Sequence, residues 1–280
     1  MACFAVEDVF VKVASASMPV SHLLIIFGAG GALVFASAIL SRGESLFNRQ
    51  VISRPMLIRA VFEMLGRLFY ALAVALAPLS SATAILQTTP ILVVAGAAFI
   101  FREKVGWRRW SAIVVGMIGV LCIIRPATEN FTVFSVFAVL GTLGFAGRDL
   151  ASRAAPASLG ASMLGLYGFL AIFAAGVLFS IWEWTPFAWP EMSVFLLLVG
   201  AIFSGVVAYV GLMKAMRTGE VSAVTPFRYC RLLFGIAFGV TLFKEKLDSA
   251  TLAGCSLIVA SGLYIMYSIN RAKKSHSASA

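Results

Sequence analysis

The sequence from residue 20 to 40 reads Val-Ser-His-Leu-Leu-Ile-Ile-Phe-Gly-Ala-Gly-Gly-Ala-Leu-Val-Phe-Ala-Ser-Ala-Ile-Leu and contains no charged residue. An α-helix needs about 20 consecutive apolar residues to cross the hydrocarbon core of a membrane. This stretch therefore predicts a transmembrane helix over Val20–Leu40.

Further apolar runs of this kind stand between charged or Pro/Gly-rich breaks. They are Met1–Ala14, Leu57–Ala77, Leu79–Phe101, Trp110–Ile124, Phe131–Gly147, Ala161–Trp182, Val194–Met213, Val221–Phe243 and Thr251–Ile269. The connections between them are a few residues long and leave no room for a soluble domain. The predicted fold class is therefore an all-α membrane protein with ten transmembrane helices.

The composition supports this class. Of the 280 residues, 61% are hydrophobic and only 12% are charged, whereas a soluble domain carries about 25% charged residues. The net charge of +10 does not indicate nucleic-acid binding, because the Lys and Arg residues lie mostly in short segments between apolar runs. The cysteines and histidines form no cluster with metal-ligand spacing, and no P-loop is present, so neither a metal, a cofactor nor ATP-driven pumping is expected.

Charge placement predicts the orientation of the helices. With the N-terminus in the cytoplasm, the connecting segments on the outer side hold Lys12, Arg125, Lys244 and Lys246. The cytoplasmic segments hold a much larger set, namely Arg42, Arg49, Arg54, Arg102, Lys104, Arg108, Arg109, Arg148, Arg153, Lys214, Arg217, Arg271, Lys273 and Lys274. Basic residues are enriched on the cytoplasmic side of membrane proteins. We therefore expect a multi-pass protein of the cell inner membrane with both termini in the cytoplasm.

Two matches within the chain indicate an internal repeat. Phe4-Ala5-Val6-Glu7-Asp8 matches Phe145-Ala146-Gly147-Arg148-Asp149, and Phe101-Arg102-Glu103-Lys104 matches Phe243-Lys244-Glu245-Lys246 at an offset one residue larger. Two matches at nearly one offset argue for duplication, into residues 1–126 and 127–280 with five helices each. Because five is odd, the second half inserts upside down relative to the first. Inverted repeats are a recurrent construction of secondary transporters.

The repeat also bears on the start of the chain. The second copy has a full apolar run before its Phe-Ala motif, but the first copy has only three residues there. We expect an upstream extension of roughly ten mostly apolar residues to complete the first span. No cleavable signal peptide is expected, because the first run contains charged residues and no basic segment precedes it.

The pattern resembles the drug/metabolite transporter superfamily, and specifically its EamA-like permeases. The resemblance rests on Ala71–Ser80, on Pro90 and Glu103, and on Glu245 followed by Gly254 and Gly262. It implies a transporter that works without ATP and moves amino acids, nucleosides, vitamins or drugs. The Glu7-Asp8 start is similar to that of bacterial riboflavin importers of this superfamily. The chain departs from the pattern at Leu232, which aligns with Pro90.

Charged residues deep in a predicted span are the candidate binding residues, because burying a charge in a membrane costs at least a few kcal/mol. Arg228 and Arg231 lie three apart on one face of the ninth run, with Tyr229 beside them. Paired fixed cations are suited to hold a carboxylate, a phosphate or an electron-rich ring. The alternative is an internal ion pair between these arginines and Glu63 that only locks the helices together.

Four further polar residues are candidates for the same site. Glu63 and Arg67 are spaced i, i+4 on the third run and are able to pair with each other. Glu63 is also the candidate site for a coupling proton, because a buried carboxylate takes up a proton more readily than an exposed one. Gln87 and Tyr167 are expected to line the cavity or to hydrogen-bond between helices. Charged pairs nearer the helix ends, Asp8 with Lys12 and Asp149 with Arg153, are interpreted as caps or snorkelling residues.

These features predict a secondary transporter of a small organic solute that works by alternating access between the two halves. A vitamin such as riboflavin or an amino-acid-like solute fits this class. The expected partners are the solute, membrane lipid and a coupling proton, with a homodimer left open and no nucleic acid. The alternatives are a membrane scaffold or receptor, which would move no solute, and an intramembrane enzyme, which would need a concentrated polar constellation.

The predicted orientation is tested with reporter fusions. A fusion at the C-terminal tail and one within the basic loop at 102–109 should both report the cytoplasm, and a fusion within 183–190 should report the outside. The ten-helix count is wrong if the tail and the 102–109 loop report opposite sides.

Overall fold

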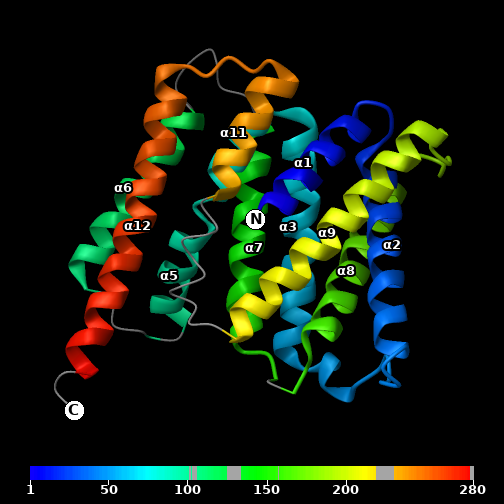
Figure 1. The fold of residues 1–280 in the computed structure, drawn as a ribbon, viewed down its shortest axis with the longest axis horizontal. Coiled ribbons are helices and arrows are strands. Elements are labelled where there is room, and N and C mark those ends of the chain that lie inside the picture. The colour runs from blue at the N-terminus through cyan, green and yellow to red at the C-terminus, as the bar shows by residue number, and fades with distance from the viewer. Residues whose placement is uncertain (101, 103–105, 125–133, 157, 219–229, 278–280) are drawn as a thin grey trace.

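The computed structural model describes residues 1–100, 102, 106–124, 134–156, 158–218 and 230–277, and every element in these ranges is helical (Figure 1). The longer helices are α2 (Val20–Leu40), α3 (Arg54–Leu76), α6 (Trp107–Ile124), α7 (Phe134–Arg153), α8 (Ala161–Glu183), α9 (Met192–Thr218) and α12 (Ser249–Ser277). The shorter ones are α1 (Ala2–Ser15), α4 (Leu79–Leu86), α5 (Thr89–Ile100), α11 (Cys230–Phe243) and a 3-10 turn over Arg49–Ile52. The predicted all-α class is confirmed.

Several helices are long and apolar enough to cross a membrane. Among the described residues there are five, namely Val20–Leu40, Leu79–Ile100, Phe134–Arg153, Ala161–Glu183 and Met192–Leu212. Helix α3 has the length of a span but carries Arg59, Glu63 and Arg67 in its middle. The protein is thus a multi-pass membrane protein in which these three charged side chains of α3 are buried.

The predicted fourth helix is broken in two. Sequence alone predicts one run over Leu79–Phe101, but α4 ends at Leu86 and α5 begins at Thr89. Pro90 has no backbone N–H to donate to the carbonyl of Leu86, and its ring crowds that carbonyl. The Thr89 hydroxyl donates to the Leu86 carbonyl instead, at 2.6 Å. Residues 221–229 of the predicted ninth helix lie outside the described residues.

Small residues bring the helices close together. A Cβ atom on Gly144 of α7 would lie 2.3 Å from the Cα of Gly66 in α3, and one on Gly119 of α6 would lie 2.8 Å from the carbonyl of Gly254 in α12. Such contacts are typical of membrane helices, where backbone packing rather than exclusion of water drives association. The main helix pairs are α3 with α7, α2 with α8, α6 with α12 and α1 with α9.

These pairs set the shape of the molecule. Helices α6 and α12 stand together at one edge, and α2 and α8 at the other (Figure 1). Between them lie α1, α3, α7 and α9, around which the buried polar residues gather. The centre of the bundle is therefore the place to look for a binding site.

The Gly144 contact predicts a stability effect. Replacing Gly144 with Ala should lower the melting temperature by several degrees, because the added methyl group meets the α3 backbone and over-packing typically costs 1–3 kcal/mol. Gly211→Ala is the matched control, since a Cβ atom there has nothing within 4 Å. It should leave melting unchanged or slightly raised, because Ala favours helix over Gly. Equal melting of both variants would contradict the close contact.

Candidate functional site

A stripe of polar side chains along one face of α3 forms the base of the site. Arg59, Glu63, Arg67 and Tyr70 follow each other at helical spacing, and each is less than a tenth exposed. From Arg59 to Tyr70 the helix rises roughly 16 Å, about half the hydrocarbon thickness. Charges at this depth need partners. The partners come from four different helices.

Arg67 pairs with α1. Its guanidinium group donates to a carboxylate oxygen of Glu7, and its central carbon lies 4.4 Å from the centre of the Phe27 ring on α2. The predicted i, i+4 pair between Glu63 and Arg67 is therefore wrong. Each of the two side chains faces a different neighbouring helix and meets a better-placed partner there.

Arg231 pairs with Asp8. Its Nε donates to Oδ2 at 3.0 Å, and Nη2 lies 2.7 Å from both carboxylate oxygens. Tyr70 donates to the same carboxylate at 3.2 Å, and the Phe4 ring lies 4.9 Å from the guanidinium carbon. The alternative of an ion pair between Arg231 and Glu63 is wrong, because Asp8 occupies the guanidinium group. The cap expected of Asp8 is likewise replaced by this bond between helices.

Glu63 lies between two arginines. Its carboxylate accepts from Arg59, one turn before it, at 3.4 Å and from Arg148 of α7 at 3.1 Å. Arg148 also pairs with Asp149 at 2.9 Å. Two guanidinium groups on one carboxylate compensate its charge in an apolar environment.

Arg59 extends this cluster to α9. It donates to the Tyr209 hydroxyl, to the Ser152 hydroxyl at 3.0 Å and to the Leu164 carbonyl at 3.3 Å. Gly168 gives the cluster its room, because a Cβ atom there would lie 3.2 Å from the Tyr209 oxygen and 3.6 Å from Glu63. A side chain on α8 at this point would press on the ion pairs.

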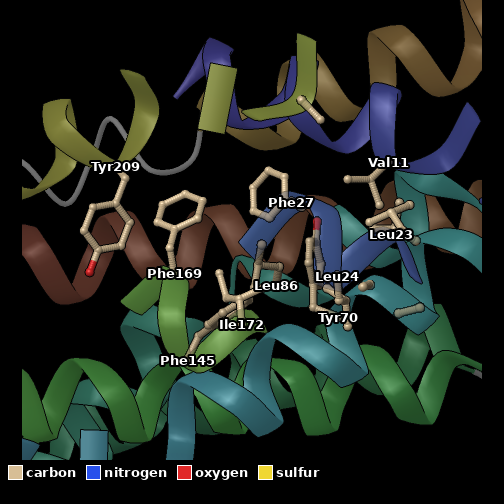
Figure 2. Close-up of a cluster of buried hydrophobic side chains, with 14 of the residues drawn as sticks. Val11, Leu23, Leu24, Phe27, Tyr70, Leu86, Phe145, Phe169, Ile172 and Tyr209 are labelled. Atoms are coloured by element: carbon tan, nitrogen blue, oxygen red, sulfur yellow. The ribbon is translucent and has the colours of Figure 1, made fainter. Parts of the chain in front are cut away.

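These groups surround a central cavity that offers the centres of water-sized spheres a volume of about 80 Å³. Its polar lining is Glu7, Glu63, Arg67, Gln87, Thr89, Arg148, Tyr209 and Arg231. Aromatic rings form an apolar wall: Phe27 lies 5.2 Å from Phe169, and Phe169 lies 6.0 Å from Tyr209, between ring centres (Figure 2). A site with paired charges on one side and neighbouring aromatic rings on the other suits a small organic molecule with polar and planar parts.

Gln87 reaches the cavity from the break between α4 and α5. The two residues that follow it point back into α4, where the Thr88 hydroxyl donates to the Ile85 carbonyl at 2.7 Å and the Thr89 hydroxyl donates to the Leu86 carbonyl. These bonds satisfy the last carbonyls of α4. The Gln87 side chain is therefore left to face the cavity. Broken helices with this placement occur at the binding sites of transporters.

The cavity gathers most of the predicted site residues that the structure describes. Glu63, Arg67, Gln87 and Arg231 line it. Arg228 and Tyr229 lie outside the described residues. Tyr167 is absent from the lining: its hydroxyl donates to the Leu46 carbonyl at 3.3 Å, in the loop after α2, rather than into the cavity or to another helix.

Sequence reasoning missed Glu7, Arg148 and Tyr209 as cavity residues. The predicted repeat offers a signal for them, since Glu7 and Arg148 occupy matching positions in its two copies. At the larger offset Tyr209 aligns with Arg67.

Two residues tie the far end of the bundle together. The Lys12 ammonium donates to the carbonyls of Val74 and Ala77 at 3.1 and 2.7 Å, at the end of α3, as its interpretation as a helix cap predicts. The Glu245 carboxylate accepts from the Leu79 and Ser80 backbone N–H groups at 2.5 and 3.0 Å, at the start of α4. A carboxylate at a helix N-terminus satisfies free N–H groups and complements the helix dipole.

A multi-pass helical bundle with charged residues paired around a central cavity defines a membrane transporter, and comparison with known proteins gives its family. A model of the EamA-like transporter family matches residues 1–125 and 132–267, so the chain belongs to this family. The resemblance inferred from the sequence is thereby confirmed.

Named relatives are transporters of different solutes. An S-adenosylmethionine uptake transporter of Rickettsia felis is 28% identical over 224 residues, 79% of this chain and 74% of the relative. A pseudopaline exporter of Pseudomonas aeruginosa is 28% identical over 260 residues, 91% of this chain and 89% of the relative. A riboflavin transporter of Vibrio cholerae is 27% identical over 189 residues, 67% of this chain and 62% of the relative. The chain is thus a permease rather than an enzyme.

The fold is also found in a solved protein. A crystal structure superposes with a TM-score of 0.65 and 21% identity over 94% of each chain. The likeness establishes the fold alone.

The Asp8–Arg231 pair predicts a thermodynamic coupling. Asp8→Asn and Arg231→Gln should each lower stability by about 3–5 kcal/mol, because each leaves a buried charge without its partner. The double variant should lose much less than the sum of the two. Glu63→Gln combined with Arg231→Gln is the control and should be nearly additive. Thermal unfolding of the three single and two double variants in detergent measures both cycles, and additivity of Asp8 with Arg231 would refute the pair.

Proposed function

We propose that the protein is a secondary transporter that carries a small organic solute across the cell inner membrane, with the central cavity as its binding site. The observation that carries the proposal is the cavity itself, where arginines and carboxylates from α1, α3, α7 and α11 meet below a row of aromatic rings. Charged groups this deep in a membrane protein mark solute pathways more often than not. The family supplies the class of activity.

The proposal includes ten spans in two inverted halves, residues 1–126 and 127–280, with both termini in the cytoplasm. Helix packing supports it, because exchanging the halves maps the main helix pairs onto one another. It turns the pair α3–α7 into α9–α1, α3–α8 into α9–α2 and α5–α7 into α11–α1, and it maps α2–α8 and α6–α12 onto themselves. The backbone supports it too, since the aligned residues Arg102 and Lys244 both have φ of 52°. The division at residue 126 agrees with the two stretches that the family model matches.

Alternating access follows from contacts between the halves at both ends of the cavity. Near the start of α3, Arg59 and Glu63 of the first half bond to Tyr209 and Arg148 of the second. Near its end, Asp8 bonds to Arg231 and the start of α4 is capped by Glu245. We propose that one set opens while the other stays closed, which moves the cavity from one side to the other as the halves rock.

The relatives' names give no common solute, since S-adenosylmethionine, riboflavin and pseudopaline differ in charge and size. The polar and aromatic lining fits a vitamin or an amino-acid-like solute. Proton coupling at Glu63 and association into a homodimer stay predictions from the sequence. Lipid contact follows from the many exposed apolar side chains of α2, α6, α8 and α9.

The transport proposal is tested in proteoliposomes loaded with no solute and supplied with a mixture of riboflavin, S-adenosylmethionine and amino acids. The wild-type protein should accumulate at least one of them. Gly205→Leu should reduce that uptake to background, because a Cβ atom there would already lie 2.8 Å from Phe27 and 3.2 Å from the Glu7 carboxylate, so the side chain fills the cavity.

Gly211→Leu is the matched control on the same helix, where a side chain meets open space. It should transport as the wild type does. Melting curves of both variants separate a blocked cavity from a misfolded protein. Wild-type vesicles that move none of the solutes in either direction would favour a receptor or scaffold and reject the proposal.

A further inference from the structure

Two hydrogen-bond donors in the cavity have no partner among the described residues. The Nε–H group of Arg67 and the Nε2 amide of Gln87 are buried and donate to no acceptor there, although both side chains line the cavity. Gln87 is 3% exposed and Arg67 is 8% exposed. The other atoms of this kind in the described ranges, on His22, Ser53 and Thr185, belong to residues outside the cavity lining.

Leaving a buried donor unpaired is costly, because the group has lost its hydrogen bonds to water and gains none in the protein. The polar groups next to these two donors do form hydrogen bonds within the protein. Thr88 and Thr89, next to Gln87, both bond to carbonyls of α4, and the other end of the Arg67 guanidinium group bonds to Glu7. The two donors thus stand out from a neighbourhood in which polar groups are otherwise satisfied.

The two carboxylates that line the cavity are already engaged. Glu7 holds Arg67, and Glu63 holds both Arg59 and Arg148. A cationic group on a solute would have to displace one of these arginines to reach a carboxylate. An oxygen acceptor on a solute meets free N–H groups without breaking any pair. The Phe27–Phe169 contact offers a flat apolar surface close by, because the Arg67 guanidinium group lies over Phe27.

We propose that the transported solute carries a carbonyl or carboxylate oxygen that accepts hydrogen bonds from Arg67 Nε and Gln87 Nε2, and a planar ring that packs on the aromatic wall. The proposal rests on the transport function above and narrows its substrate class. A carboxylate and a ring carbonyl are two sources of the same acceptor chemistry.

Three probes separate these sources, with thermal shift and titration calorimetry of the purified protein as readouts. L-Tryptophan offers a carboxylate beside a ring, riboflavin offers ring carbonyls, and tryptamine has the ring and the ammonium of tryptophan without the carboxylate. Tryptophan or riboflavin should stabilise the wild-type protein, and tryptamine should bind at least tenfold more weakly than tryptophan if the carboxylate is the source. If only riboflavin binds, the ring carbonyl is the source.

Gln87→Met removes the amide while keeping the length of the side chain. Its Kd for the bound probe should rise about twofold to tenfold, as for the loss of one neutral hydrogen bond. Its melting temperature without solute should rise by roughly 2–4 °C, because an unpaired buried amide has been replaced by an apolar group. Arg67→Lys, which keeps a cation for Glu7 but has no Nε–H group, should weaken probe binding similarly.

The control is Thr142→Val on α7, since the Thr142 hydroxyl is buried, bonded to the Ala138 carbonyl at 2.6 Å and outside the cavity lining. It should leave probe affinity unchanged. Opposite effects of Gln87→Met on affinity and on melting support the proposal. It is overturned if Gln87→Met binds as the wild type does or melts lower, if tryptamine binds as tightly as both other probes, or if neither tryptophan nor riboflavin binds. If a probe binds but is not taken up by vesicles, the transport function is rejected while the proposed binding site stands.

Discussion

The structure depends on the need to pair the charges of α3 inside a membrane. Arg59, Glu63 and Arg67 sit at successive turns of a helix that packs against α1, α7 and α8. A charge left alone at this depth costs a few kcal/mol or more, which is comparable to the net stability of a domain. Each charge therefore fixes the position of a neighbouring helix through its partner. Arg67 holds Glu7 of α1, Glu63 holds Arg148 of α7, and Arg59 holds Tyr209 of α9. Packing of glycines brings the helices close, and the ion pairs decide their register.

Ion pairs are a poor source of stability compared with well-packed apolar side chains, because desolvation offsets most of their attraction. They do have a property that apolar packing lacks: a pair between two halves has a strong geometric preference and is able to exchange one partner for another. The bidentate bond of Arg231 to Asp8 and the shared carboxylate of Glu63 are of this kind. In the proposed mechanism the cavity opens on either side in turn, and this needs contacts between the halves that break and reform.

Much of the fold could be predicted from the sequence, because the membrane imposes a length and a polarity on each helix. Val20–Leu40 shows this, since its structural bounds are those of the apolar run. The break at Gln87 is explained by Pro90, but apolarity continues across it and conceals it from a hydropathy reading. The site was harder to predict. Local spacing suggested a Glu63–Arg67 pair, yet three-dimensional packing offered Arg148 and Glu7, and no local rule ranks a partner on another helix above one on the same helix. Tyr167 failed for the same reason, since its face of α8 could not be assigned without the packing.

In the proposed repeat, the two copies keep their main helix contacts while their side chains have diverged, and this divergence gives the cavity its place. Glu63 and Arg148 meet between α3 and α7; by the alignment of the halves, the matching residues on α9 and α1 are Gly205 and Glu7. Those two are also neighbours, because a Cβ atom on Gly205 would lie 3.2 Å from the Glu7 carboxylate. An ion pair thus fills the contact between α3 and α7. In the matching contact between α9 and α1, Gly205 has no side chain, so Glu7 bonds to Arg67 instead and space is left beside Gly205. A strictly symmetric chain would have filled or emptied both places. The asymmetry allows one half to hold the bundle together through Glu63 while the other leaves room for a solute.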